Sequence, residues 1–133
     1  MSAITSHGWL FTLVRDESLT NVESVRFLKH LLAQLDRKLL VIWDGSPIHR
    51  GKEVKAYLAD GATKQIHLER LPPYAPDLNP DEGVWNHLKY VELRNVCCLD
   101  LLHLRHQLDL AVTRLRRKPY LIQTFFEGAG LDL

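Results

Sequence analysis

The chain has 133 residues, of which 46% are apolar and 25% are charged, and its formal net charge is +1. These values are typical of a folded globular domain and exclude an intrinsically disordered chain, a collagen-like repeat and a low-complexity tail. A net charge this close to zero neither favours nor excludes a nucleic-acid partner.

We expect neither a membrane-spanning helix nor a secretory signal in this sequence. No apolar run approaches the length of about 18 residues that a membrane-spanning helix needs, and no basic segment precedes an apolar run at the N-terminus. The cysteines Cys97 and Cys98 are adjacent, a spacing that rarely gives a disulfide, and two thiols alone make a poor zinc site. We therefore expect a reduced, cytoplasmic protein.

The first third of the chain is expected to contain a hairpin and a helix. Short β-compatible segments at 2–5 and 9–14 predict two strands joined as a hairpin. Thr20 and Glu23 have the spacing of a capping box, which predicts a helix over 21–35. Its apolar residues recur at helical spacing: Val22, Val25, Leu28, Leu32 and Leu35.

Strands and helices are expected to alternate in the middle of the chain. The run 38–43 is apolar throughout, which predicts a strand buried on both faces. A short amphipathic helix is expected over 52–58, and alternating side chains predict a strand over 65–71. The proline-rich segment 72–76 cannot be a helix interior or a central strand.

Helices are expected over the rest of the chain. The first covers 77–90, with Pro80 in its first turn, and a long one covers 100–118 until Pro119 breaks it. A short apolar helix at 121–126 follows. The apolar stripes of the first two helices contain Val84, Leu88, Val91, Leu101, Leu104, Leu108, Val112 and Leu115.

The order β-β-α-β-α-β-α-α, followed by the short helix at 121–126, predicts an α/β fold with a mixed sheet and some parallel pairing. Helices would flank this sheet on its faces. We find no internal repeat and no linker, so one domain over 1–133 is expected.

Two carboxylates stand out by their positions. Asp44 ends the strand at 38–43, and ligands of α/β sheets gather at the carboxyl ends of strands. Glu82 lies in the first turn of the helix after the proline-rich segment. Each also has a plain structural explanation, because Asp before Gly often forms turns and an acid in a first helical turn complements the helix dipole.

Both acids lie within long sequence motifs. Residues 43–50 read Trp-Asp-Gly-Ser-Pro-Ile-His-Arg, and residues 71–82 read Leu-Pro-Pro-Tyr-Ala-Pro-Asp-Leu-Asn-Pro-Asp-Glu, followed by Trp85 and Leu88-Lys89. Here the chain resembles the DDE transposases of bacterial insertion sequences in the mariner-like superfamily. Their pattern has an Asp at a strand end, then "PxHR", then "LPPYSPxLNPxExxWxxLK". The 37 residues between the two acids (45–81) are a spacing that this family uses, and the resemblance covers nearly the whole chain.

The resemblance implies a ribonuclease-H-like fold in which three carboxylates hold two divalent metals, Mg²⁺ or Mn²⁺. Two metals about 3.5–4 Å apart activate the attacking oxygen and stabilise the leaving oxygen of a phosphodiester. Asp44 and Glu82 would be catalytic metal ligands. Four residues of the motifs would orient the acids or contact DNA: His49, Arg50, Asn79 and Lys89. For His49 a purely structural role at the start of a helix stays equally open.

One position of the family's pattern has no match in this chain. The family's first Asp lies on a strand before the hairpin, whereas Asp16 and Glu17 lie in a loop and Asp36 at a helix exit. We therefore expect a sheet lacking its first strand, a metal site completed by an Asp not present in this chain, and no activity of this chain alone. Either Met1 starts a truncated or second reading frame of a broken element, or another polypeptide supplies that Asp. The hairpin could pair with 38–43 instead, but strand donation by a partner or marginal stability is favoured.

The expected partners are DNA, at the element ends and at the target, and a second copy or a chain carrying the missing N-terminal part. The expected location is the bacterial cytoplasm, at the nucleoid when DNA is bound. The competing interpretation is a non-catalytic remnant, or an interaction module that associates with a full-length transposase or with DNA. A basic run fits DNA phosphates and the helix dipole about equally well: Arg114, Arg116, Arg117 and Lys118.

Overall fold

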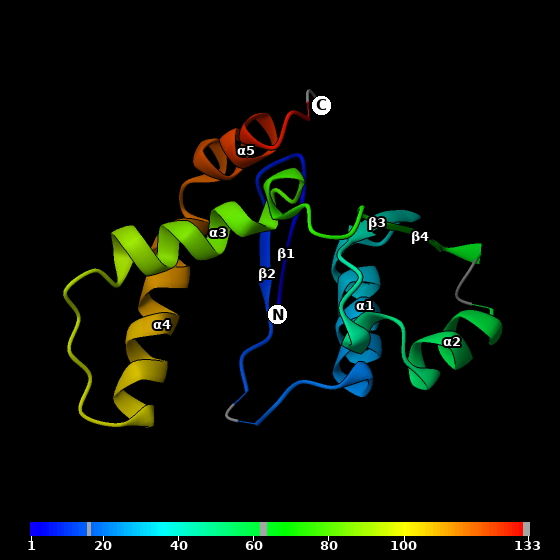
Figure 1. The fold of residues 1–133 in the computed structure, drawn as a ribbon, viewed down its shortest axis with the longest axis horizontal. Helices are drawn as coiled ribbons and strands as arrows, with labels where there is room; N and C mark the ends of the chain where they lie inside the picture. The colour runs from blue at the N-terminus through cyan, green and yellow to red at the C-terminus, as the bar shows by residue number, and fades with distance from the viewer. Residues whose placement is uncertain (16, 62–63, 132–133) are drawn as a thin grey trace. The chain divides into compact units, whose positions relative to one another are not determined.

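The computed structural model describes residues 1–15, 17–61 and 64–131 (Figure 1). The chain divides into two compact units. Met1 and Leu13–Ala75 make the first unit, and Ser2–Thr12 with the chain from Pro76 onward make the second. The elements confirm a mixed α/β protein of helices and short sheets in the expected order. Asp16, which we placed in a loop, lies outside the described residues.

In the first unit, helix α1 (Asn21–Leu35) has the bounds that the capping box predicts. The Thr20 side chain accepts a hydrogen bond from the backbone N–H of Val22, and the Glu23 carboxylate accepts one from the N–H of Thr20 at 2.8 Å. The predicted apolar stripe is wrong in part. The buried residues are Ser24, Phe27, Leu28 and Leu31, because the side of α1 that meets the rest of the unit is rotated from that stripe.

The sheet of the first unit consists of β3 (Leu39–Trp43) and β4 (Ile66–Arg70), which pair in parallel as expected. A 3-10 turn, η1 (Pro47–His49), and helix α2 (Lys52–Ala59) connect them. The prediction that β3 is buried on both faces is wrong. Leu40 and Ile42 are 64% and 49% exposed, because only one face of the two-stranded sheet is covered.

In the second unit, β1 (Ser2–Ile4) and β2 (Leu10–Thr12) form the predicted antiparallel hairpin. Helices α3 (Asp81–His87), α4 (Leu101–Arg116) and α5 (Pro119–Gly128) pack with it (Figure 1). Their shared core is made of Leu10, Val84, Leu88, Ala111, Val112, Leu115 and Ile122. No helix among the described residues is long and apolar enough to cross a bilayer.

The single helix predicted over 77–90 is wrong. A 3-10 turn, η3 (Pro76–Leu78), comes first, and α3 begins only after Pro80. Proline has no N–H to donate and disfavours helical backbone in the residue before it, which delays the helix start.

The end of this segment is a π-helical turn, η4 (Leu88–Glu92). The N–H of Leu93 donates to the carbonyl of Leu88 at 2.8 Å, which adds one residue to the turn. Val91, predicted to be in the apolar stripe, is therefore 62% exposed, and Leu93 packs against the core instead.

The other two helices also differ from their predictions. The N-terminal half of α4 extends beyond the core, so Leu101 and Leu104 are exposed while Val112 and Leu115 are buried. Pro119 ends α4 as expected but also starts α5, where its missing N–H costs nothing.

Candidate functional site

Asp44 directly follows β3, at the carboxyl end of the parallel sheet, as the sequence predicts. Its Oδ1 accepts a hydrogen bond from the backbone N–H of Ser46 at 3.0 Å, which fixes the carboxylate over the Gly-Ser-Pro turn. The side chain is 54% exposed, so the carboxylate remains accessible from solvent. Arg70, at the end of β4, lies against Gly45, and a Cβ on that glycine would be 3.0 Å from its Nε.

His49, at the end of η1, points back to Asp44. Its Nε2 lies 3.5 Å from Oδ1 of Asp44, and its ring stacks on the Trp43 indole with centroids 4.4 Å apart and planes at 12°. Burial lowers the pKa of His49 below its ordinary value, and the Asp44 carboxylate partly offsets this effect. This geometry is consistent with the prediction that His49 lies near Asp44.

Ser24 is a residue that the sequence analysis missed. It is 1% exposed on α1, and its hydroxyl donates to the carbonyl of Ile48 at 2.7 Å. The same oxygen lies 3.3 Å from Nδ1 of His49. The only signal for this role in the sequence is that Ser24 is a polar residue among the apolar positions of α1.

Glu82 lies in the first turn of α3, in the second unit, and is partly exposed. Asn79 organises this turn: its Oδ1 accepts the N–H of Asp81 at 3.1 Å, and its carbonyl accepts the N–H of Glu82 at 3.1 Å. Asp81 ties the turn to β1, because its Oδ2 accepts the Ser2 hydroxyl at 2.6 Å. Burial raises the pKa of Asp81, and the bond from Ser2 opposes the rise.

A comparison with models of known families matches residues 1–101 to the DDE superfamily endonuclease. The chain belongs to this family. The match confirms the resemblance to DDE transposases and includes both acids and the motif residues His49, Asn79 and Lys89. No curated protein and no solved structure is significantly similar to the chain.

The two acids lie in different units, Asp44 in the first and Glu82 in the second. Within the described ranges, no three His, Cys, Asp or Glu side chains cluster in a way that could hold a metal. The donor chemistry of each acid nevertheless fits a divalent cation, because accessible carboxylate oxygens are ligands that Mg²⁺ and Mn²⁺ accept.

The other two motif residues are on the surface of the protein. Arg50 is exposed, one residue after η1. Lys89 places its ammonium 5.2 Å from the centre of the Tyr90 ring. It also borders an open, mostly apolar hollow of about 390 Å³ with Trp85, Leu88, Leu93 and Leu108.

The basic run at the end of α4 makes contacts within the second unit itself. Arg114 Nε donates to Glu92 at 2.7 Å, and Lys118 Nζ lies 3.9 Å from the same carboxylate. Arg116 donates from Nε to the carbonyl of Leu10 and from Nη2 to the hydroxyl of Thr12, both at 3.1 Å. Three of the four cations therefore stabilise the second unit.

Proposed function

We propose that this chain acts in DNA transposition by metal-dependent strand cleavage and strand transfer. Asp44 and Glu82 would hold Mg²⁺ or Mn²⁺, together with an Asp that lies outside residues 1–133. The observation that carries this proposal is the accessible Asp44 carboxylate, fixed at the carboxyl end of a parallel strand within the region that matches the family. When bound, such metals activate the attacking oxygen and stabilise the leaving one.

The surroundings of each acid support these roles. The backbone N–H of Ser46 holds the Asp44 carboxylate in place, and the ring of His49 lies beside it. The hydrogen bonds that Asn79 accepts fix the backbone conformation at Glu82. Preorganised ligands of this kind lower the cost of assembling a charged site.

The proposed fold is ribonuclease-H-like. The antiparallel hairpin, α1 and the parallel strands occur in the chain order that this fold uses, which supports the proposal. The proposed partners are DNA, at the element ends and at the target, and a chain carrying the first strand with its Asp. Exposed Arg50 and Lys89 would contact DNA phosphates.

The test is a DNA-cleavage assay on the full chain, with a polypeptide carrying the first strand and its Asp supplied in trans or by fusion. The substrate is the DNA element that encodes the chain, with its flanking ends. We expect nicking only with Mg²⁺ or Mn²⁺ and only with the added segment. Asp44→Asn and Glu82→Gln should each reduce nicking to background, because each removes a metal-binding charge.

Two matched variants control for nonspecific loss of charge. Asp60→Asn changes an exposed carboxylate of the first unit, and Glu127→Gln changes one of the second. Both should nick DNA like the unmodified chain. If the complemented chain binds DNA but never cleaves it, the non-catalytic interpretation is correct, and cleavage that survives both acid substitutions would place the chemistry elsewhere.

A further inference from the structure

The imidazole of His49 is held on three sides, entirely within the first unit. Nδ1 lies 3.3 Å from the hydroxyl oxygen of Ser24, Nε2 lies 3.5 Å from Oδ1 of Asp44, and the ring face stacks on Trp43. A histidine with this many neighbours has a fixed orientation. The remaining question is which of its nitrogens carries the proton.

The hydrogen bonds of Ser24 determine which nitrogen of His49 carries the hydrogen. A serine hydroxyl has one hydrogen, and Ser24 donates it to the carbonyl of Ile48 at 2.7 Å. Its oxygen can therefore only accept at the 3.3 Å contact, so Nδ1 of His49 must be the donor. The neutral ring with hydrogen on Nδ1 has a bare lone pair on Nε2.

That lone pair faces another acceptor. Nε2 and Oδ1 of Asp44 lie 3.5 Å apart with no hydrogen between them in this tautomer. Two ligand atoms that each lie about 2.0–2.2 Å from one metal are separated by roughly 3.0–3.5 Å at ordinary coordination angles. A metal-ligating histidine also usually donates its other N–H to an acceptor, as His49 does to Ser24.

We propose that His49 Nε2 and the Asp44 carboxylate together bind one divalent transition metal, and that Ser24 positions His49 for this role. The inference rests on the proposed function only in taking Asp44 as a metal ligand. Within the described residues no third His, Cys, Asp or Glu joins the pair, so water, phosphate oxygens or a carboxylate from elsewhere complete the coordination. Because Mg²⁺ takes oxygen ligands whereas transition metals also accept nitrogen, His49 should raise the affinity of the site for Mn²⁺ more than its affinity for Mg²⁺.

The first test uses the full chain with Mn²⁺ and without DNA. Electron spin-echo modulation of bound Mn²⁺ detects coupling to an imidazole ¹⁴N nucleus. We expect this coupling in the unmodified chain and its loss in His49→Ala and Asp44→Asn. Mn²⁺ affinity should fall at least about 10-fold in His49→Ala and about 10-fold in Ser24→Ala. Mg²⁺ affinity should change much less in His49→Ala.

His67→Ala is the matched control, because His67 is an exposed histidine of β4 whose Nε2 lies 2.6 Å from Glu69. It should keep both the coupling and the affinity. Nitrogen-15 spectra of the imidazoles at pH 7.5 should show hydrogen on Nδ1 of His49, and this signature should change in Ser24→Ala. Amide spectra of each variant verify that it is folded.

Four results would overturn the proposal: bound Mn²⁺ without ¹⁴N coupling, coupling that persists in His49→Ala, no saturable binding at millimolar Mn²⁺, or His49 carrying hydrogen on Nε2. The last result would make the contact with Asp44 an ordinary hydrogen bond or ion pair. These readouts are independent of DNA cleavage. Asp44→Asn can lose Mn²⁺ binding and still nick DNA when the missing segment is supplied. In that case the proposed function fails, while the proposal that His49 and Asp44 bind a metal stands.

Discussion

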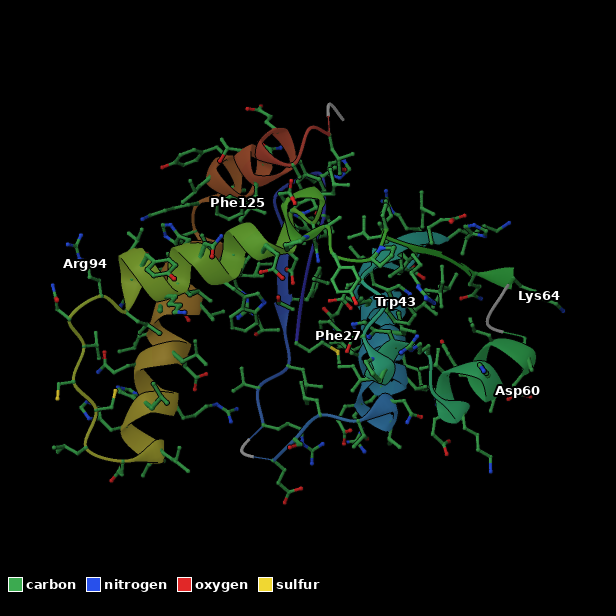
Figure 2. The ribbon with its side chains drawn as sticks, in the orientation of Figure 1. Phe27, Trp43, Asp60, Lys64, Arg94 and Phe125 are labelled. Atoms are coloured by element: carbon green, nitrogen blue, oxygen red, sulfur yellow. The ribbon has the colours of Figure 1, made fainter. Side chains whose placement is uncertain are left out.

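Gly83 packs directly against Phe125, so that a Cβ atom on the glycine would lie 2.6 Å from Cγ of the ring. In Figure 2 the labelled Phe125 lies on α5, where that helix approaches α3. Gly83 follows Glu82 in the first turn of α3, so the packing that positions this helix also positions the proposed metal ligand. The lack of a side chain at Gly83 is therefore a requirement of tertiary packing.

Gly83→Ala should destabilise the protein by about 1–3 kcal/mol, because overpacking at a rigid contact exceeds the gain in helix propensity. Urea unfolding monitored by circular dichroism measures the change. Gly128→Ala is the control, since nothing lies within 4 Å of its added Cβ. It should be neutral or slightly stabilising. Equal midpoints for the two variants would contradict the close packing.

Arg116→Ala should lower the free energy of unfolding by about 1 kcal/mol or more, because it removes hydrogen bonds to the carbonyl of Leu10 and the hydroxyl of Thr12. Arg117→Ala removes an equal charge from the next, exposed position and should change stability little. Thermal melting of both variants tests this. A larger loss in Arg117→Ala would be the opposite of what the contacts predict.

Glu92 should make stability depend on pH. The hydrogen bond from Arg114 lowers its pKa below the ordinary 4.5, burial partly opposes this, and the bond to His87 adds to it. Because the folded-state pKa is below the unfolded one, the stabilisation is complete above about pH 4.5 and is lost as pH falls through the folded-state value.

Glu92→Gln should therefore be less stable than the unmodified chain at pH 6–7, and the difference should shrink as pH decreases below about 4.5. Urea unfolding across this range measures it. Glu127→Gln, at an exposed site of α5, should show a much smaller change with pH. A difference for Glu92→Gln that grows at low pH would mean that the sign is wrong.

Asn79→Ala should destabilise the start of α3, because the side-chain oxygen that accepts the N–H of Asp81 is lost. The expected cost is about 1 kcal/mol, as for a helix cap. Hydrogen exchange of the amides of the first turn, Asp81 and Glu82, should accelerate. Asn86→Ala, on the exposed side of the same helix, should leave these rates unchanged.

The local sequence predicts those features that neighbouring residues stabilise by themselves. Thr20 and Glu23 determine the start of α1 through bonds within a few residues of each other. The apolar run and the Gly-Ser-Pro turn place Asp44 at a strand end for the same reason. The family motif is also local, and residues 1–101 match the family as the motif predicts.

Other features depend on contacts between distant segments, which periodicity cannot reveal. Pro80 and the π turn shifted the apolar face of the segment after residue 76, exchanging Val91 for Leu93. The nearness of Asp44 to Glu82, and a first strand outside residues 1–133, remain predictions.

By itself, the sequence determined the order of the elements, the capped start of α1 and the family of this chain. Only the tertiary structure decided that Ser24 is buried against His49 and that the basic residues of α4 contact Glu92 and the hairpin. The difference lies in how far apart in the sequence the interacting residues are. Capping, turns and motifs involve hydrogen bonds between residues a few positions apart, whereas Ser24 and His49 are 25 positions apart and Arg116 and Leu10 are 106 apart. Such pairs form only when packing within each unit determines which faces of its elements are in contact.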